Sequence, residues 1–155
     1  MNLYAESSAV LAWLLEESTA DEVRRFLAGA ETVVASELTL VECRRALVRL
    51  QSLGHVSEAQ ARRLGATLDR LVAHWTLLTV DREVSSRAGL PLPGEPLRTL
   101  DALHLSSAMN ARGSVPGMAF LTLDERLRRA ADMAGFEVLP GPPELVAEPT
   151  ERPSR

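Results

Sequence analysis

The chain has 155 residues, of which 46% are hydrophobic and 25% are charged, and its formal net charge is −4. This length and hydrophobic content are sufficient for one domain with a sizeable core. The negative net charge excludes nucleic-acid binding through bulk positive charge, so any polyanion must meet a local group of arginines.

The single cysteine, Cys43, excludes an internal disulfide, and the segment around it, VECRRAL, contains no second thiol for a metal cluster or a redox pair. We therefore expect a buried, inert thiol. The longest apolar stretches are far shorter than the roughly 20 residues that span a bilayer, and no basic region precedes the first apolar stretch. These features predict a cytoplasmic protein that does not contact a membrane.

Short apolar runs alternate along the chain with longer stretches of helical period, a pattern typical of a parallel sheet covered by helices. The predicted strands are residues 2–5, 32–35, 75–80, 118–123 and 136–140. The fold class is therefore predicted to be α/β, with a central parallel sheet of four to five strands.

The first helix is predicted directly after residues 2–5, because four apolar side chains at 9, 10, 13 and 14 share one helical face. Thr19 and Glu22 stand at capping-box spacing and predict a helix through Ala28. Ser57 and Gln60 predict a second capped helix in the same way. The remaining helices are predicted over residues 37–53, 57–74, 81–89, 99–111 and 124–134.

One domain accounts for most of the chain. Residues 90–97, LPLPGEPL, form a loop that is too short to separate two domains. The last 16 residues hold five of the nine prolines, which predicts a flexible tail. We expect a domain over residues 1–140 and a tail over residues 141–155.

Four acids lie at predicted strand ends or in early turns of predicted helices. Glu6 follows the first strand, and Asp124 follows the strand at 118–123. Glu42 lies early in the helix that begins at 37, and Asp101 lies in the first turn of the helix that begins at 99. Ligands of open parallel sheets bind beyond the carboxyl ends of the strands, so all four acids are expected to face one site.

Each acid taken alone has a structural explanation. Glu42 follows Thr39 at capping-box spacing, and Asp101 favours the positive end of its helix. Asp124 is a potential N-cap, and Glu6 a solvated side chain. An acidic site is favoured because all four recur at strand ends or helix starts within otherwise apolar segments.

Four carboxylates placed together repel one another unless a cation neutralises them. Oxygen ligands without cysteine or a histidine pair favour Mg²⁺ or Mn²⁺ over Zn²⁺, and these ions support phosphodiester hydrolysis. His104, three residues after Asp101, is a further candidate ligand or base. Its apolar neighbours favour a packed, hydrogen-bonded core histidine instead.

In their order and spacing, the four acidic segments resemble those of the PIN-domain ribonucleases, most closely the VapC-type toxins of bacterial toxin–antitoxin pairs. The segments are LYAESSAVLAWLLEE, SELTLVECRRAL, RTLDALHLSSA and FLTLDERLRRAADMAG, and the resemblance covers residues 2–140. It implies a three-layer α/β/α sandwich, homodimerisation and endonucleolytic cleavage of RNA with Mg²⁺ or Mn²⁺. It also implies a partner, a small VapB-like antitoxin that lies across the active-site groove.

The resemblance also implies roles for individual side chains. The metal-binding and catalytic acids would be Glu6, Glu42, Asp101 and Asp124. Ser7 would orient the first acid, and the hydroxyl of Thr122 would support the fourth. The family's first acid is normally Asp, whereas this chain has Glu6, one methylene longer. Our hypothesis is that Glu6 still binds metal and that the two serines after it cap the helix.

Substrate contacts are less visible in the sequence, and Arg98, beside the start of the Asp101 helix, is the predicted phosphate contact. Two alternative functions remain open. Instead of a toxin, the chain would be a PIN nuclease of RNA processing without an antitoxin, or a catalytically silent PIN-like binding module. The replacement of the usual Asp by Glu6 is the main sequence argument for the silent module.

Overall fold

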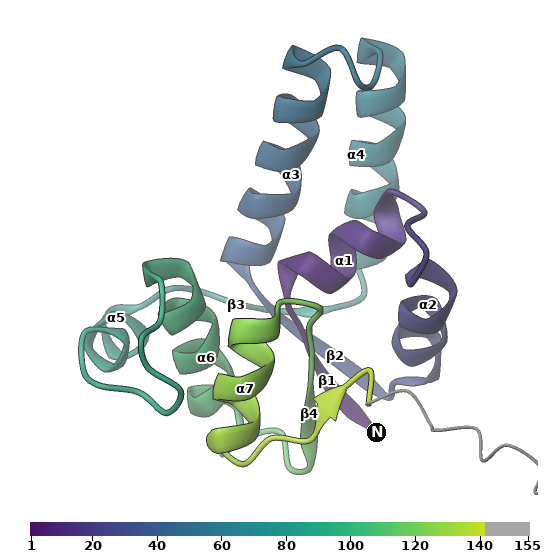
Figure 1. Cartoon of the computed structure of the whole chain (residues 1–155). Coiled ribbons are helices and arrows are strands. Elements are labelled where there is room, and N and C mark those ends of the chain that lie inside the picture. Colours follow the sequence, from purple (N-terminus) through teal and green to yellow (C-terminus); the bar gives the residue numbers. More distant parts are fainter. Residues whose placement is uncertain (142–155) are drawn as a thin grey trace, which may run out of the picture.

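The computed structural model describes residues 1–141 and shows a five-stranded parallel sheet with helices on both faces (Figure 1). The strands are β1 (Asn2–Ala5), β2 (Thr32–Ser36), β3 (Thr76–Leu78), β4 (Met118–Leu121) and β5 (Val138–Leu139). The helices are α1 (Ser7–Leu14), α2 (Ala20–Gly29), α3 (Glu37–Ser52), α4 (Glu58–Val72), α5 (Arg82–Ala88), α6 (Thr99–Ala111) and α7 (Glu125–Met133).

The three layers follow from the alternation of side chains along the strands. Tyr4, Val34 and Phe120 belong to one core cluster, which includes buried residues of α6 and α7. Their strand neighbours, such as Leu3 and Ala5, belong to clusters on the other face with residues of α1 to α4. The predicted α/β fold with a parallel sheet of four to five strands is therefore confirmed, and the sheet has five.

Helices α3 and α4 form an antiparallel arm that extends beyond the end of the sheet (Figure 1). Gly54, with φ of 73°, follows the end of α3 and allows the tight turn between them. The predicted capping box of α4 is confirmed, because Gln60 N–H donates to Ser57 Oγ and Ser57 N–H donates to Gln60 Oε1.

The predicted cap of α2 is wrong, and the capping-box explanation of Glu42 does not hold either. Thr19 precedes α2, but its backbone is helical (ψ of −1°) and its side chain accepts no capping hydrogen bond. Ser36 caps α3 in place of Thr39, and the buried Thr39 hydroxyl donates to the Ala5 carbonyl at 3.1 Å. Thr39 thus ties α3 to the end of β1, beside Glu6.

The sheet order β3-β2-β1-β4-β5 indicates where a ligand site is expected. The chain adds β2 and β3 on one side of β1 and then returns to add β4 and β5 on the other side. The carboxyl ends of β1 and β4 therefore flank a topological switch point, where open α/β sheets bind ligands. Glu6 directly follows β1, and Asp124 lies three residues after the end of β4.

The predicted tail at 141–155 lies outside the described residues except for Gly141, so it stays a prediction. Within residues 1–141, no helix combines the length and the apolar composition that crossing a bilayer requires.

Candidate metal centre

Glu6 joins the end of β1 to the start of α1. Its backbone N–H donates to the Leu121 carbonyl at 3.0 Å, which extends the pairing with β4. Its carboxylate accepts the Ser8 N–H at 3.0 Å and so caps the helix. The prediction that the serines cap this helix is wrong, because the carboxylate one residue earlier occupies that position.

The serine hydroxyls contact the Glu6 carboxylate instead. Ser7 Oγ donates to Oε1 at 2.6 Å, and Ser8 Oγ donates to Oε2 at 2.5 Å. Thr122, beyond the end of β4, adds a third hydroxyl to Oε2 at 2.7 Å. These donors replace the water that the 5% exposed Glu6 has lost, and they fix the direction of the carboxylate.

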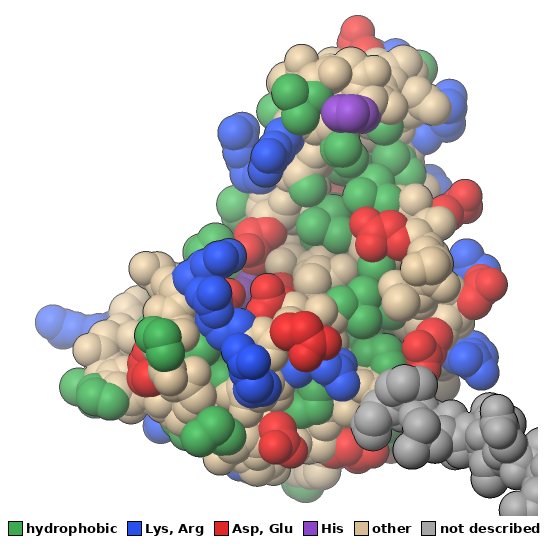
Figure 2. All heavy atoms as spheres, viewed as in Figure 1, with side chains coloured by type: hydrophobic (Ala, Val, Ile, Leu, Met, Phe, Trp, Pro, Cys, Tyr) green, Lys and Arg blue, Asp and Glu red, His purple; other side chains and the backbone are tan. Residues whose placement is uncertain are grey.

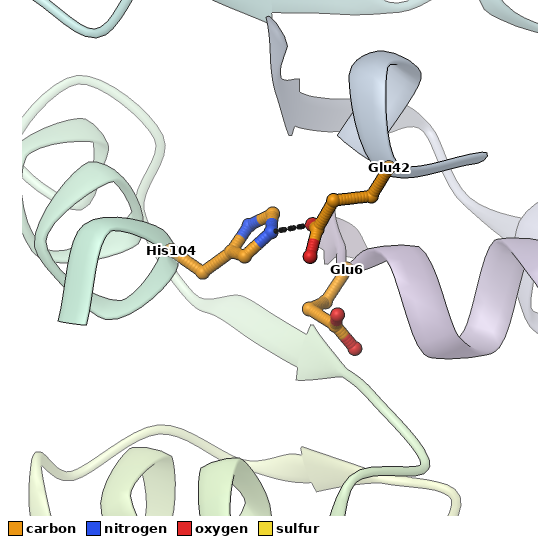
Figure 3. A group of neighbouring side chains, drawn as sticks. All are labelled: Glu6, Glu42 and His104. Atoms are coloured by element: carbon orange, nitrogen blue, oxygen red, sulfur yellow. Dashed lines mark hydrogen bonds and ion pairs between the residues drawn. The ribbon is translucent and has the colours of Figure 1, made fainter. Parts of the chain in front are cut away.

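A second acid enters the site from α3. Glu42 points toward His104 of α6, and Glu42 Oε2 lies 2.5 Å from His104 Nε2 (Figure 3). The other ring nitrogen, Nδ1, lies 3.0 Å from the Tyr4 hydroxyl. Burial raises the pKa of Tyr4, and the Glu6 charge adds to this, so the phenol stays protonated. The Glu42 carboxylate can only accept, so we assign a ring proton to Nε2, which donates it to Glu42.

This contact keeps Glu42 charged. Burial alone would raise the pKa of Glu42, but the hydrogen bond and charge of His104 outweigh it and hold the pKa below its ordinary value. The neighbouring Cys43 behaves in the opposite way. Burial, together with the charges of Glu6 and Glu42, raises the pKa of the Cys43 thiol to about 12, as expected for an inert cysteine.

Glu6, Glu42 and His104 converge although they come from three different elements. Each offers one ligand atom, and these atoms all lie within 4.8 Å of one another. His104 is only 1% exposed and is hydrogen-bonded at both nitrogens, as the core interpretation of the sequence predicts. Sequence reasoning missed that its partner is a site carboxylate. The available signal was its position three residues after Asp101, on the same face of the helix.

Asp101 and Asp124 lie outside this tight group, and each is held by the start of its own helix. Asp124 Oδ1 accepts the N–H groups of Arg126 and Leu127, both at 2.9 Å, and so caps α7. Asp101 Oδ2 accepts the Arg98 N–H at 3.3 Å. Burial raises the pKa of Asp101, the Arg98 bond partly offsets this, and the charge of Asp124 raises it further. The two aspartates therefore lie close enough to repel each other.

Thr122 connects the two parts of the site. Its hydroxyl donates to Glu6 Oε2 and accepts the backbone N–H of Asp124 at 3.2 Å. The predicted contact with the fourth acid thus exists, but it goes through the backbone of Asp124 rather than its carboxylate. Within residues 1–141, no hydrogen bond reaches Asp124 Oδ2, which leaves this oxygen available to a ligand.

The donor set fits a divalent cation. Four carboxylates surround one end of the sheet, and their mutual repulsion is relieved when a cation lies between them. Oxygen-rich sites suit Mg²⁺ and Mn²⁺, and His104, whose Nε2 donates to Glu42, holds that carboxylate rather than serving as a ligand itself.

Comparisons with known proteins agree with this description. The PIN domain family matches residues 3–133. Ribonuclease VapC46 of Mycobacterium tuberculosis is 37% identical over 137 residues, which cover 88% of this chain and 95% of that protein. Ribonuclease VapC35 of the same species is 32% identical over 141 residues, with the same coverage.

Solved structures share the fold. The M. tuberculosis toxin VapC20, described as cleaving the sarcin–ricin loop, superimposes with a TM-score of 0.61 at 16% identity over 86% of this chain and 95% of that chain. A chain of VapBC2 from Rickettsia felis, solved bound to a DNA fragment from their promoter, gives a TM-score of 0.58 at 12% identity over 89% and 97%. At these identities, the likeness shows the fold alone.

Proposed function

The chain belongs to the PIN-domain family and, within it, to the VapC ribonucleases, and on that premise we propose that it is a metal-dependent endoribonuclease toxin that hydrolyses RNA phosphodiester bonds. The proposal is supported by the close approach of Glu6 and Glu42 beside the switch point of the sheet, by the Thr122 hydroxyl that joins Glu6 to the backbone of Asp124, and by the electrostatic interaction of Asp124 with Asp101. A helix-capping or solvated role for each acid does not explain why they meet.

We assign catalysis and metal binding to the four acids Glu6, Glu42, Asp101 and Asp124, with Mg²⁺ or Mn²⁺ as the cofactor. When bound, such an ion supplies Lewis-acid polarisation of the phosphoryl oxygen and lowers the pKa of a coordinated water. Asp124 Oδ2 and the pair Glu6 and Glu42 present the oxygens that would hold it.

The surrounding residues position these acids. Ser7 and Thr122 fix the Glu6 carboxylate by the hydrogen bonds described above, and His104 fixes Glu42. Such contacts orient metal ligands and influence the affinity of a site. Arg98, exposed at the start of α6, is proposed to contact an RNA phosphate beside the reacting bond.

The longer side chain of Glu6 is compatible with this role. Its carboxylate turns back to cap its own helix while it also reaches the Thr122 hydroxyl across the switch point. We propose that the extra methylene is absorbed in this way and that Glu6 remains a ligand in place of the usual Asp.

The proposal includes an antitoxin partner of the VapB type and a homodimer of this chain. We propose that the protein acts in the cytoplasm, where RNA is available. The solved relatives support the antitoxin, because the R. felis and Salmonella typhimurium proteins are VapBC assemblies. A short neighbouring reading frame that encodes a DNA-binding segment and a tail would agree with a toxin. Its absence would favour a PIN nuclease of RNA processing.

The test is cleavage of a synthetic single-stranded RNA pool by the purified protein with Mn²⁺ or with EDTA. We expect cleavage only with metal, and none by Asp124→Asn, a change that keeps a good N-cap for α7. Asp132→Asn on the exposed side of the same helix is the matched control and should cleave normally. Cleavage in EDTA, or equal cleavage by Asp124→Asn, would overturn the assignment. Metal binding without any cleavage would favour the silent module.

A further inference from the structure

A cavity of about 510 Å³ lies between α7 and the loop that leads into α6. Its lining residues are Gly94, Glu95, Pro96, Leu97, Arg126, Arg129 and Met133. The loop runs directly into Arg98 and the first turn of α6, and α7 begins directly after Asp124. The cavity therefore lies between the segment that leads to Asp101 and the helix that follows Asp124.

The loop is fixed closely against α7. Gly94 has φ of 83°, and a Cβ atom at this position would lie 2.6 Å from the Cα of Ala130. The carboxylate of Glu95 accepts the N–H groups of Leu92 and Leu97, at 3.3 and 2.6 Å. The negative charge of Glu95 is thus engaged with the backbone of its own loop.

The three arginines of α7 differ in their contacts. Arg128 donates to the carbonyls of Thr122 and Pro140 and therefore has a structural role. In contrast, the side chains of Arg126 and Arg129 make no hydrogen bond or ion pair with any of residues 1–141. Arg126, Arg129 and Met133 are spaced to share one face of α7, and all three line the cavity.

Arginine side chains extend from the cavity to the acidic site. Arg98 and Arg126 both lie near enough to Asp101 to lower its pKa, against the larger effect of burial. Figure 2 shows arginine side chains in a band over α6 and α7, with acidic side chains immediately beside it. An acidic centre repels the phosphates of its own substrate, so neighbouring cations are needed to hold the strand.

We propose that Arg126 and Arg129, together with the loop at 94–97, form a phosphate-binding subsite for single-stranded RNA that continues from Arg98. The inference rests on the proposed function. Guanidinium groups bind phosphate oxygens in a bidentate manner, and two of them on one helix face, with no partner among residues 1–141, suit successive phosphates. The apolar surfaces of Pro96, Leu97 and Met133 offer contact to ribose or base, without donors that would select a sequence.

The test uses Arg126→Gln/Arg129→Gln and a short fluorescein-labelled single-stranded RNA, measured by anisotropy in EDTA at several NaCl concentrations. Each lost phosphate contact reduces the salt slope of log K by about 0.7, so the double variant should lose about 1.4 and bind roughly tenfold more weakly near 0.15 M salt. In cleavage with Mn²⁺, KM should rise more than kcat falls. Arg126→Lys/Arg129→Lys should restore the salt slope, because both charges remain, but should recover only part of the affinity, because lysine cannot bind a phosphate in a bidentate manner.

Arg62→Gln/Arg63→Gln is the matched control, since it removes the same charge from exposed positions on α4. It should change RNA affinity less than about twofold, as expected for surface charges beyond the Debye length. Equal losses in both double variants, or no loss in either, would overturn the subsite while leaving nuclease activity intact.

Failure of the proposed function gives a different result. Unmodified protein that neither binds the RNA nor cleaves RNA with Mn²⁺ would overturn both proposals. If Arg126→Gln/Arg129→Gln binds RNA normally but escapes inhibition by the antitoxin, the surface serves a protein partner, and the RNA subsite is wrong.

Discussion

The candidate site has two halves that satisfy their charges differently. In the inner half, Glu6 and Glu42 are buried to different degrees and receive hydrogen bonds from side chains, including the imidazole of His104. In the outer half, Asp101 and Asp124 receive hydrogen bonds from residues 1–141 only through backbone N–H groups, and the charge of Asp124 adds to the cost of ionising Asp101.

The difference indicates which half needs a cation. Glu42 already has a favourable contact without a cation, because the hydrogen bond from His104 holds its pKa below the ordinary value. The pKa of Asp101 is raised by burial and by a neighbouring carboxylate, so a bound cation would relieve a cost that the protein alone leaves in place. Variants of the two halves should therefore behave differently.

The largest expected effect is on catalysis by the outer half. Asp101→Asn should reduce Mn²⁺-dependent RNA cleavage by about 10³-fold, the effect of several kcal/mol of transition-state stabilisation. The measurement is kcat/KM on a short labelled RNA, with Asp132→Asn as the control. Loss of less than tenfold would show that Asp101 is not part of the reacting centre.

The next effect is on positioning in the inner half. His104→Gln removes the imidazole that holds Glu42 and should lower metal affinity or activity by about 10- to 100-fold. Tyr4→Phe removes only the hydrogen bond at His104 Nδ1 and should lower metal affinity or activity by a smaller factor. Measuring Mn²⁺ affinity and kcat alongside stability distinguishes a loss of Glu42 positioning from a general loss of stability. A His104→Gln protein with lower stability but unchanged Mn²⁺ affinity would contradict the positioning role.

The two halves should show opposite effects on the stability of the metal-free protein. Glu42→Gln weakens a charge-assisted hydrogen bond and should cost about 1–3 kcal/mol. Asp101→Asn removes a repelling charge and keeps an oxygen for the Arg98 N–H, so it should stabilise the protein slightly. Urea denaturation in EDTA measures both. Changes of the same sign would remove the distinction between the halves.

The pH dependence should follow the same signs. The pKa of Glu42 is lowered, so its contribution to stability is present above the ordinary value near 4.5 and is lost as the pH falls through the folded-state pKa. The pKa of Asp101 is raised, so its protonation favours the folded metal-free protein as the pH falls through that higher value. As the pH falls, the Glu42→Gln protein should therefore lose less stability than the unmodified protein. The Asp101→Asn protein should lack the stabilisation that protonation of Asp101 gives the unmodified protein.

The smallest effect concerns the connection between the halves. Thr122→Val removes one donor to Glu6 and the acceptor of the Asp124 N–H, and should cost about 1–2 kcal/mol of stability. Mn²⁺ affinity should fall by less than in the acid variants, as measured by calorimetry. A Thr122→Val protein with unchanged stability and affinity would show that the two halves act independently.

The sequence predicted the parts of this site that follow from local pattern and sheet geometry. Apolar runs bounded by turns located all five strands, and the carboxyl ends of parallel strands necessarily bring Glu6 and Asp124 to one edge. The contact of Glu42 with His104 joins positions 62 residues apart, and it depends on how α3 and α6 pack. Local spacing placed His104 on the same helix face as Asp101, but it did not indicate that Glu42 is its partner.

The wrong cap expectations at the serines after Glu6 and at Thr39 have a common physical cause, which does not apply to Thr19. At Glu6 and at Thr39, a tertiary contact competes with the local capping pattern. The serines after Glu6 donate to its carboxylate because that buried charge needs donors, and the Thr39 hydroxyl donates to the end of β1. Capping propensities describe an isolated helix, so they fail where a helix starts at a buried charged site.

Calorimetric titration with Mn²⁺ at neutral pH tests the central claim most directly, with the intact protein, Asp101→Asn and the control Asp132→Asn. The account predicts saturable binding to the intact protein and the control, and binding at least about tenfold weaker to Asp101→Asn. Equal binding by all three proteins, or no saturable binding by the folded intact protein, would contradict an acidic metal centre at this end of the sheet.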